Sequence, residues 1–325
     1  MSSPRIRLEA HVPPEAAGRR LDQALAALFP DYSRTRLKSW IDAGQVRVDG
    51  ALPRGRDKLL GGEHVEIDAE LELEGRVAAQ PIALDVVHQD EDVIVIDKPA
   101  GLVVHPGAGN PDNTLQNALL SLDPVLAALP RAGIVHRLDK ETSGLLVVAR
   151  TLAAHTELVR MLEARDVHRE YEAVCVGVMT GGGTVDAPIG RHRVDRVKMT
   201  VREDGRESVT HYRVVERYRA HTHVRVILET GRTHQIRVHL AHIGYPIVGD
   251  PTYGRRLAIP KGATPRLEAA LRGFRRQALH AARLGFDHPV NGKAMEFASP
   301  LPADMRDLLE ALREDAVAAR ASNRG

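Results

Sequence analysis

The sequence predicts an α+β fold, with a mainly antiparallel central sheet and helices on its flanks. Short apolar runs of strand length recur along the chain, and helical spacing appears only between some of them. There is no regular strand–helix–strand alternation, which a parallel sheet would require. The 325 residues are 43% hydrophobic and 27% charged, which leaves room for a sizeable core and roughly two domains.

The cysteine count and the hydropathy indicate where the protein works. Cys175 is the one cysteine of the chain, and its apolar surroundings favour a small buried hydrophobe over a nucleophilic thiol. The N-terminus shows no signal-peptide pattern, and no apolar run approaches the roughly 20 residues of a membrane span. We therefore expect a soluble cytoplasmic protein with no membrane partner.

A small module is predicted at 17–68, after a loosely held arm at 1–16 that has three prolines and no clear period. A first helix ends at Pro30, and a second helix has Ser33 as its N-cap and Gly44 as its terminator. Two half-buried strands follow. The apolar positions behind these elements are Leu21, Ala24, Leu25, Leu28, Val46, Val48, Val65 and Ile67.

The charge of this module favours a nucleic-acid ligand. Residues 33–60 hold seven basic groups against three acidic ones. A basic face suits a phosphate backbone, because each neutralised phosphate releases counterions, although an ordinary solvated face remains an alternative. The candidate RNA-binding residues are Arg34, Arg36, Lys38 and Arg47.

The same module resembles the S4 RNA-binding domain. The resemblance covers nearly the whole module, and it implies that the second helix lies against RNA. It rests on residues 20–22 (RLD), 33–37 (SRTRL) and 41–50 (IDAGQVRVDG).

A linker at 69–80 and a larger domain at 81–302 are expected next. Residues 63–92 hold ten acidic groups and one basic group, Arg76. A surface helix with a frayed end is predicted at 303–325, and the polar segment 191–206 is expected to form a mobile hairpin. The expected strands of the larger domain are 93–96, 145–149, 171–178, 209–218, 224–228 and 278–298, and its expected helices are 114–120, 151–165 and 233–242.

A charged segment between two apolar runs is the first candidate for chemistry. Residues 136–141 lie between Ile134-Val135 and the strand 145–149, with a turn signal at Thr142–Gly144. Folds often place reactive groups on such a loop, because the flanking strands are rigid and the loop is accessible. Asp139 is the candidate reactive group, and a hairpin turn with merely solvated charges is the alternative.

The predicted helix 233–242 supplies a partner for this carboxylate. Arg237 lies between a buried side marked by Leu240 and a polar side, so its charge needs a carboxylate. Asp139 is the obvious one. The pair would keep Asp139 ionised and aim it, as nucleophilic catalysis requires.

Other chemistries are weaker. The chain has 16 histidines, but none joins a carboxylate or a cysteine at metal-ligand spacing, so we expect no metal. A glycosidase-like pair of Asp139 and Glu141 would point to opposite faces of a strand. No Gly-rich nucleotide motif stands at a strand–helix junction.

Five motifs, in order along the second domain, resemble those of RNA pseudouridine synthases of the RluA/RluD type. They are residues 98–107 (KPAGLVVHPG), 136–145 (HRLDKETSGL), 169–171 (REY), 230–239 (TGRTHQIRVH) and 279–281 (LHA). The resemblance implies isomerisation of uridine in RNA without a cofactor or a metal. It also implies a pseudouridine synthase fold for the second domain.

The resemblance assigns roles to six residues. It implies that Asp139 is the catalytic aspartate, that Tyr171 stacks on the target base and that Arg237 pairs with Asp139. Arg137 is implied to help displace or hold the flipped uridine, His136 to bind the RNA, and Leu279 to pack under the base.

Two classes of function remain open from the sequence. The leading one is a monomeric pseudouridine synthase of 23S (large-subunit) ribosomal RNA, because the S4-like module suits a large structured target. A tRNA enzyme of the same family is one alternative. An RNA-binding ribosome-assembly factor with a silent catalytic fold is the other.

Overall fold

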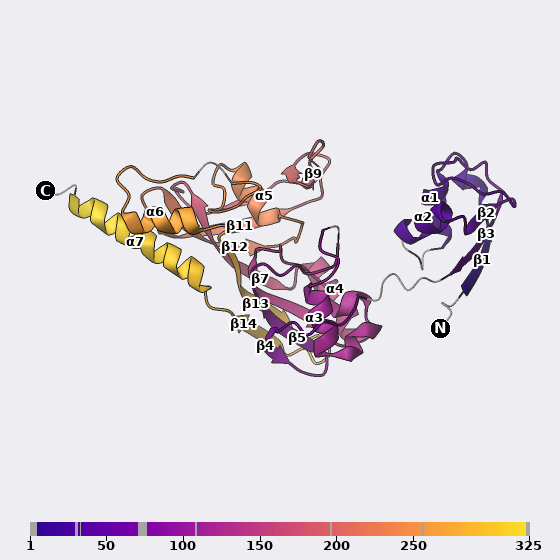
Figure 1. The fold of residues 1–325 in the computed structure, drawn as a ribbon, viewed down its shortest axis with the longest axis horizontal. Coiled ribbons are helices and arrows are strands. Elements are labelled where there is room, and N and C mark those ends of the chain that lie inside the picture. The colour runs from indigo at the N-terminus through magenta and orange to yellow at the C-terminus, as the bar shows by residue number, and fades with distance from the viewer. Residues whose placement is uncertain are drawn as a thin grey trace. The chain divides into compact units, whose positions relative to one another are not determined.

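The computed structural model describes residues 5–29, 32, 34–70, 77–107, 109–195, 197–254 and 257–322, without the side chains of residues 5, 34–36 and 70. The chain divides into two compact units, Met1–Arg76 and Val77–Gly325 (Figure 1). The predicted Ser33 cap and residues 71–76, half of the predicted linker, lie outside the described residues. Each unit has its own hydrophobic core.

The first unit is a three-stranded antiparallel sheet with two helices. Its strand order is β1-β3-β2, and its core holds Leu21, Leu25, Leu37, Trp40 and Val46. The helix that leads to Gly44 ends with that glycine in the left-handed region, at φ +72°. The elements are β1 (Arg5–His11), α1 (Leu21–Leu28), α2 (Arg34–Asp42), β2 (Val46–Val48) and β3 (His64–Glu70).

The loosely held arm predicted at 1–16 is wrong over Arg5–His11, which forms β1 in register with β3. Ile6, Leu8 and Ala10 alternate with charged residues and pack against the core. This two-residue period is the pattern of a half-buried strand, and the three prolines of 1–16 lie on either side of it. The sequence did not predict this strand, because the flanking prolines favour irregular structure.

The second unit is built on a nine-stranded sheet. Strands β4-β5-β6-β13-β7-β12-β11-β8 are neighbours in that order, and β14 pairs with β13. All pairs are antiparallel except β6 with β13, which confirms the predicted mainly antiparallel sheet. The strands are β4 (Asp85–Gln89), β5 (Val93–Lys98), β6 (Ser143–Ala149), β7 (His168–Val176), β8 (Gly183–Asp186), β11 (Val209–Arg217), β12 (His221–Leu228), β13 (Leu279–Asp287) and β14 (Ala294–Ala298).

Helices cover both faces of this sheet. In β6, Leu145 and Val147 face α4, whereas Leu146 and Val148 belong to the core shared with α3, α5, α6 and α7. A strand covered on both sides is buried along its whole length, as β6 is. The helices are α3 (Leu115–Leu122), α4 (Leu152–Ala164), α5 (Gln235–His242), α6 (Pro265–Gly273) and α7 (Ala303–Ser322), and a small ribbon joins β9 (Ile189–Arg191) to β10 (Met199–Val201).

Two local predictions differ from the structure. Gly144 is not a turn residue but lies inside β6 at φ +113°, where a Cβ would clash with the Ala281 carbonyl of β13. The predicted surface helix at 303–325 is instead α7, which lies along α6 and buries Met305, Leu308 and Leu312 in the main core (Figure 1). Its apolar period was strong enough to predict burial on one face.

Candidate active site

The segment 136–142 enters β6 and is held from several directions. The Val147 N–H donates to His136 Nε2 at 3.1 Å, and the Gly101 N–H donates to the Lys140 carbonyl at 2.9 Å. Burial, with a smaller effect of Arg169, lowers the pKa of His136 to about 3, so the ring is a neutral acceptor. The backbone around Asp139 is therefore fixed by its neighbours rather than free as a solvated turn.

Lys98 anchors the same segment from the end of β5. It is fully buried, and its ammonium group donates to the carbonyls of Pro99 at 2.7 Å, Leu102 at 3.0 Å and Lys140 at 3.1 Å. Three acceptors match the three hydrogens of an ammonium group. Burial lowers the pKa of Lys98 to about 7, against the opposing charges of Glu141 and Asp139.

Asp139 meets Arg237 as the sequence predicts. Arg237 Nη1 donates to Asp139 Oδ2 at 2.9 Å, and the two side chains are 6% and 15% exposed, respectively. The carboxylate thus keeps one edge toward solvent while the arginine lies inside the protein. A fixed but accessible carboxylate is what a nucleophile requires.

A second carboxylate, which the sequence interpretation missed, completes the arrangement. Arg237 Nε and Nη2 donate to Asp250 at 2.7 and 2.9 Å, and the Asp250 side chain is fully buried. Asp250 Oδ1 also accepts the backbone N–H groups of Thr252 and Tyr253. Asp250 therefore holds the arginine, and the arginine aims Asp139.

Tyr253 and His234 lie on the other side of this pair. The Tyr253 hydroxyl accepts the Met199 N–H at 2.8 Å and lies 2.7 Å from His234 Nδ1, to which it can donate. The His234 Nε2–H then faces Asp139 Oδ1, at 3.9 Å. Burial lowers the pKa of His234, although Asp139 opposes this, and a neutral ring with Nε2–H fits the geometry.

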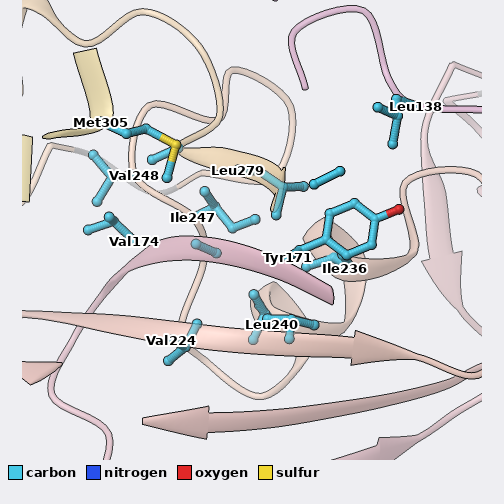
Figure 2. Close-up of a cluster of buried hydrophobic side chains, with 14 of the residues drawn as sticks. Leu138, Tyr171, Val174, Val224, Ile236, Leu240, Ile247, Val248, Leu279 and Met305 are labelled. Carbon is cyan, nitrogen blue, oxygen red and sulfur yellow. The ribbon is translucent and has the colours of Figure 1, made fainter. Parts of the chain in front are cut away.

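All six residues that the resemblance assigns to the second domain line one cavity of about 770 Å³. Tyr171 and Leu279 are 6% and 3% exposed and extend the core toward Leu138, the neighbour of Asp139 (Figure 2). Burial raises the pKa of the Tyr171 phenol. Seven arginines line the same cavity against four carboxylates: Arg131, Arg137, Arg165, Arg169, Arg206, Arg232 and Arg237, against Asp139, Glu163, Glu207 and Glu229.

The candidate RNA-binding residues of the first unit are placed only in part. The side chains of Arg34 and Arg36 lie outside the described residues. Lys38 pairs with Asp42 at 2.6 Å, and Arg47 donates to the Gly50 carbonyl at 3.0 Å, both at exposed positions. Exposed pairs of this kind contribute little stability, so RNA can displace them.

The described residues lack a metal-binding cluster and a membrane-spanning helix. Among these residues, no group of three or more His, Cys, Asp or Glu is placed to hold a metal ion. No described helix is long and apolar enough to cross a membrane.

Family models match both units. The RNA pseudouridylate synthase model matches residues 92–242, and the S4 domain model matches residues 19–52. The cavity with the aspartate–arginine pair thus lies in the unit that the pseudouridylate synthase model matches.

Similar known proteins identify the family to which the chain belongs. The chain is 61% identical over 311 residues to a ribosomal large subunit pseudouridine synthase D of Xanthomonas campestris pv. campestris, covering 96% of this chain and 94% of that one. It is 58% identical to the protein of the same name from Pseudomonas aeruginosa, covering 95% and 97%. A solved human RNA pseudouridylate synthase domain containing 4 superposes with a TM-score of 0.56 at 30% identity, covering 70% and 93%. The chain belongs to the RNA pseudouridylate synthase family and is an isomerase that converts uridine to pseudouridine.

Proposed function

We propose that this enzyme isomerises specific uridines of large-subunit (23S) ribosomal RNA, with Asp139 as the nucleophile. The observation that carries the proposal is the Asp139 carboxylate, held by Arg237 in the cavity that Tyr171 and Leu279 also line. The names of the similar bacterial proteins favour the large subunit as the target. The proposal includes a monomer that works in the cytoplasm, as the sequence predicts.

The reaction starts with extrusion of the target base. A uridine in structured RNA hides its glycosidic bond, so the nucleotide must flip into the cavity. The buried ring of Tyr171 offers a stacking partner worth about 1–3 kcal/mol, and Leu279 offers an apolar support. Because burial raises the pKa of Tyr171, the ring stays a neutral phenol at neutral pH. Arg137, exposed at the rim, can occupy the space that the base leaves.

Asp139 then attacks the sugar or the pyrimidine ring. In either route the N1–C1′ bond breaks, the freed uracil turns, a C5–C1′ bond forms, and the bond between Asp139 and the substrate breaks to release the carboxylate. The proton on C5 is lost and N1 gains one, so the net change is an isomerisation that consumes no co-reactant. The arginine holds the carboxylate in line throughout.

An Asp139→Asn variant tests this proposal. The amide keeps the size of the side chain but removes its nucleophilic charge, so we expect tritium release from rRNA labelled at uridine C5 to fall at least 10⁴-fold. RNA binding, measured by filter retention, should stay within about threefold of wild type. Residual activity within tenfold of wild type would overturn the nucleophile assignment, and preferential modification of a tRNA transcript would overturn the target.

A further inference from the structure

Arg169 is a buried cation that the described structure leaves without a carboxylate. It lies on β7, two residues before Tyr171, and is 6% exposed. Its Nη2 donates to the Glu229 carbonyl at 3.0 Å, whereas its buried Nε has no hydrogen-bond partner. No ion pair within 4.0 Å joins it to any carboxylate of the described residues.

The other buried arginines of the described chain are paired with carboxylates, unlike Arg169. Three arginines of the described chain are buried: Arg169, Arg237 and Arg276. Arg237 pairs with Asp139 and Asp250, and Arg276 pairs with Asp304 at 2.7 Å. An unpaired buried charge is costly, and burial lowers the pKa of Arg169. The buried charge of Arg169 therefore destabilises the free protein, and binding of an anionic ligand would offset this cost.

The fold keeps space open for this guanidinium. A Cβ on Gly231 would lie 2.7 Å from Arg169 Nη1. Gly231 is not among the glycines with positive φ, and without a side chain it leaves room beside the Arg169 guanidinium. Arg169 and Gly231 both line the cavity that holds Asp139 and Tyr171. The guanidinium thus faces the place where the substrate enters.

We propose that Arg169 binds a phosphodiester group of the RNA, next to the uridine that stacks on Tyr171. This inference rests on the proposed function. Residues two apart on a strand point to the same face about 6–7 Å apart, so a base on Tyr171 brings its own backbone toward Arg169. A guanidinium fork matches two phosphate oxygens, and the phosphate supplies the missing anion. The neighbouring carboxylates Glu207 and Glu229 are already occupied by Arg165.

Neutral and charge-conserving variants test the assignment, with purified full-length protein and rRNA transcript. For Arg169→Met we expect KM to rise about tenfold or more, kcat to change less than threefold and the slope of log(kcat/KM) against log[salt] to weaken by about one. Arg169→Lys should recover the slope and only part of the affinity. Arg160→Met is the matched control, because Arg160 is exposed on α4 and pairs only with Glu157, outside the cavity. It should leave all three parameters unchanged.

Stability separates a binding role from a structural one. Because Arg169→Met removes an unpaired buried charge, we expect a melting temperature equal to or above that of wild type. A residue needed only to hold the Glu229 carbonyl would instead lower it. A lower melting temperature with unchanged KM and salt slope would overturn the proposal.

Modified RNA identifies the partner directly. Short RNAs that carry the mapped target uridine are made with a single neutral methylphosphonate on its 5′ or 3′ side. One of these should raise the wild-type KM about tenfold and leave the Arg169→Met KM unchanged. If KM rises equally for wild type and Arg169→Met with the 5′ and with the 3′ methylphosphonate, the phosphate assignment is overturned. The result would then point to a uracil oxygen as the partner. Wild-type protein inactive on every RNA would instead contradict the proposed function.

Discussion

Arg237 divides its N–H groups between two carboxylates, and this division sets the properties of Asp139. Two of its nitrogens donate hydrogen bonds to Asp250 and one donates to Asp139. Because Asp250 already balances the cation, Asp139 is oriented without being fully neutralised. A carboxylate held in this way keeps a fixed direction for attack.

Replacing Asp250 should therefore disturb both stability and catalysis. We expect Asp250→Asn to lower the free energy of unfolding by about 3 kcal/mol, because it breaks a buried ion pair from one side. The value of kcat should fall more than tenfold as Arg237 loses its alignment, with a smaller change in KM. Chemical denaturation and tritium-release kinetics measure the two effects. Wild-type values for both would show that Arg237 needs no second anchor.

The same pair predicts a pH dependence of stability. Burial acts to raise the pKa of Asp250, but the hydrogen bond and charge of Arg237 outweigh it and bring the pKa below its ordinary value. The unfolded chain therefore takes up this proton at a higher pH than the folded protein. The stabilisation is present above about pH 4 and is lost as the pH falls through the folded pKa. Below pH 4 the free energy of unfolding should fall more steeply for wild type than for Asp250→Asn, and parallel curves would contradict this.

At the residue scale the sequence predicted the pair but not its support. An arginine beside Leu240 on a helix needs a carboxylate, which led to Asp139. Nothing in the pattern marked Asp250 or Tyr253, because their roles depend on a loop that returns to α5 only in the folded chain. Because a guanidinium has five N–H groups, a second acceptor for Arg237 could be expected, but the sequence did not identify it as Asp250.

Among the elements, the end of β5 fixes the reactive segment. Lys98 joins three carbonyls, one of them in the segment that carries Asp139. We expect Lys98→Met to lower the free energy of unfolding by about 2–4 kcal/mol, because three carbonyls lose the buried ammonium donor. The catalytic turnover should fall with little change in RNA affinity. The exposed Lys140→Met is the control from the same segment and should leave stability within about 0.5 kcal/mol of wild type.

Long elements were predicted better than their ends. The expected helix at 151–165 is α4, Leu152–Ala164, with the Thr151 side chain accepting the Ala154 N–H. Strand β1 was missed, and β6 begins two residues earlier than expected, at Ser143. Gly144 reads as a turn signal in isolation, and only the close approach of β13 explains a glycine inside a strand.

For the whole molecule, the division into two units was predictable from composition. The change from a basic module to an acidic stretch falls near the boundary at Arg76–Val77. Which side chains of the two units meet one RNA could not be predicted, because that depends on the RNA as much as on the chain.

Removing the first unit should separate recognition from chemistry. We expect a chain that begins at Val77 to keep its fold, because its core contains no residue of the first unit. At limiting enzyme, its kcat/KM on rRNA should fall at least tenfold through KM, since the S4 domain no longer contributes phosphate contacts. Circular dichroism checks the fold and tritium release checks the rate. An unchanged kcat/KM would show that the S4 domain does not serve this substrate.

The most direct measurement is pseudouridine mapping of large-subunit ribosomal RNA from cells that lack this gene. Cells complemented with wild type should regain pseudouridine at specific sites of that RNA. Cells that express Asp139→Asn at the same protein level should not. Restoration by Asp139→Asn, or loss of pseudouridine only from tRNA, would contradict the account.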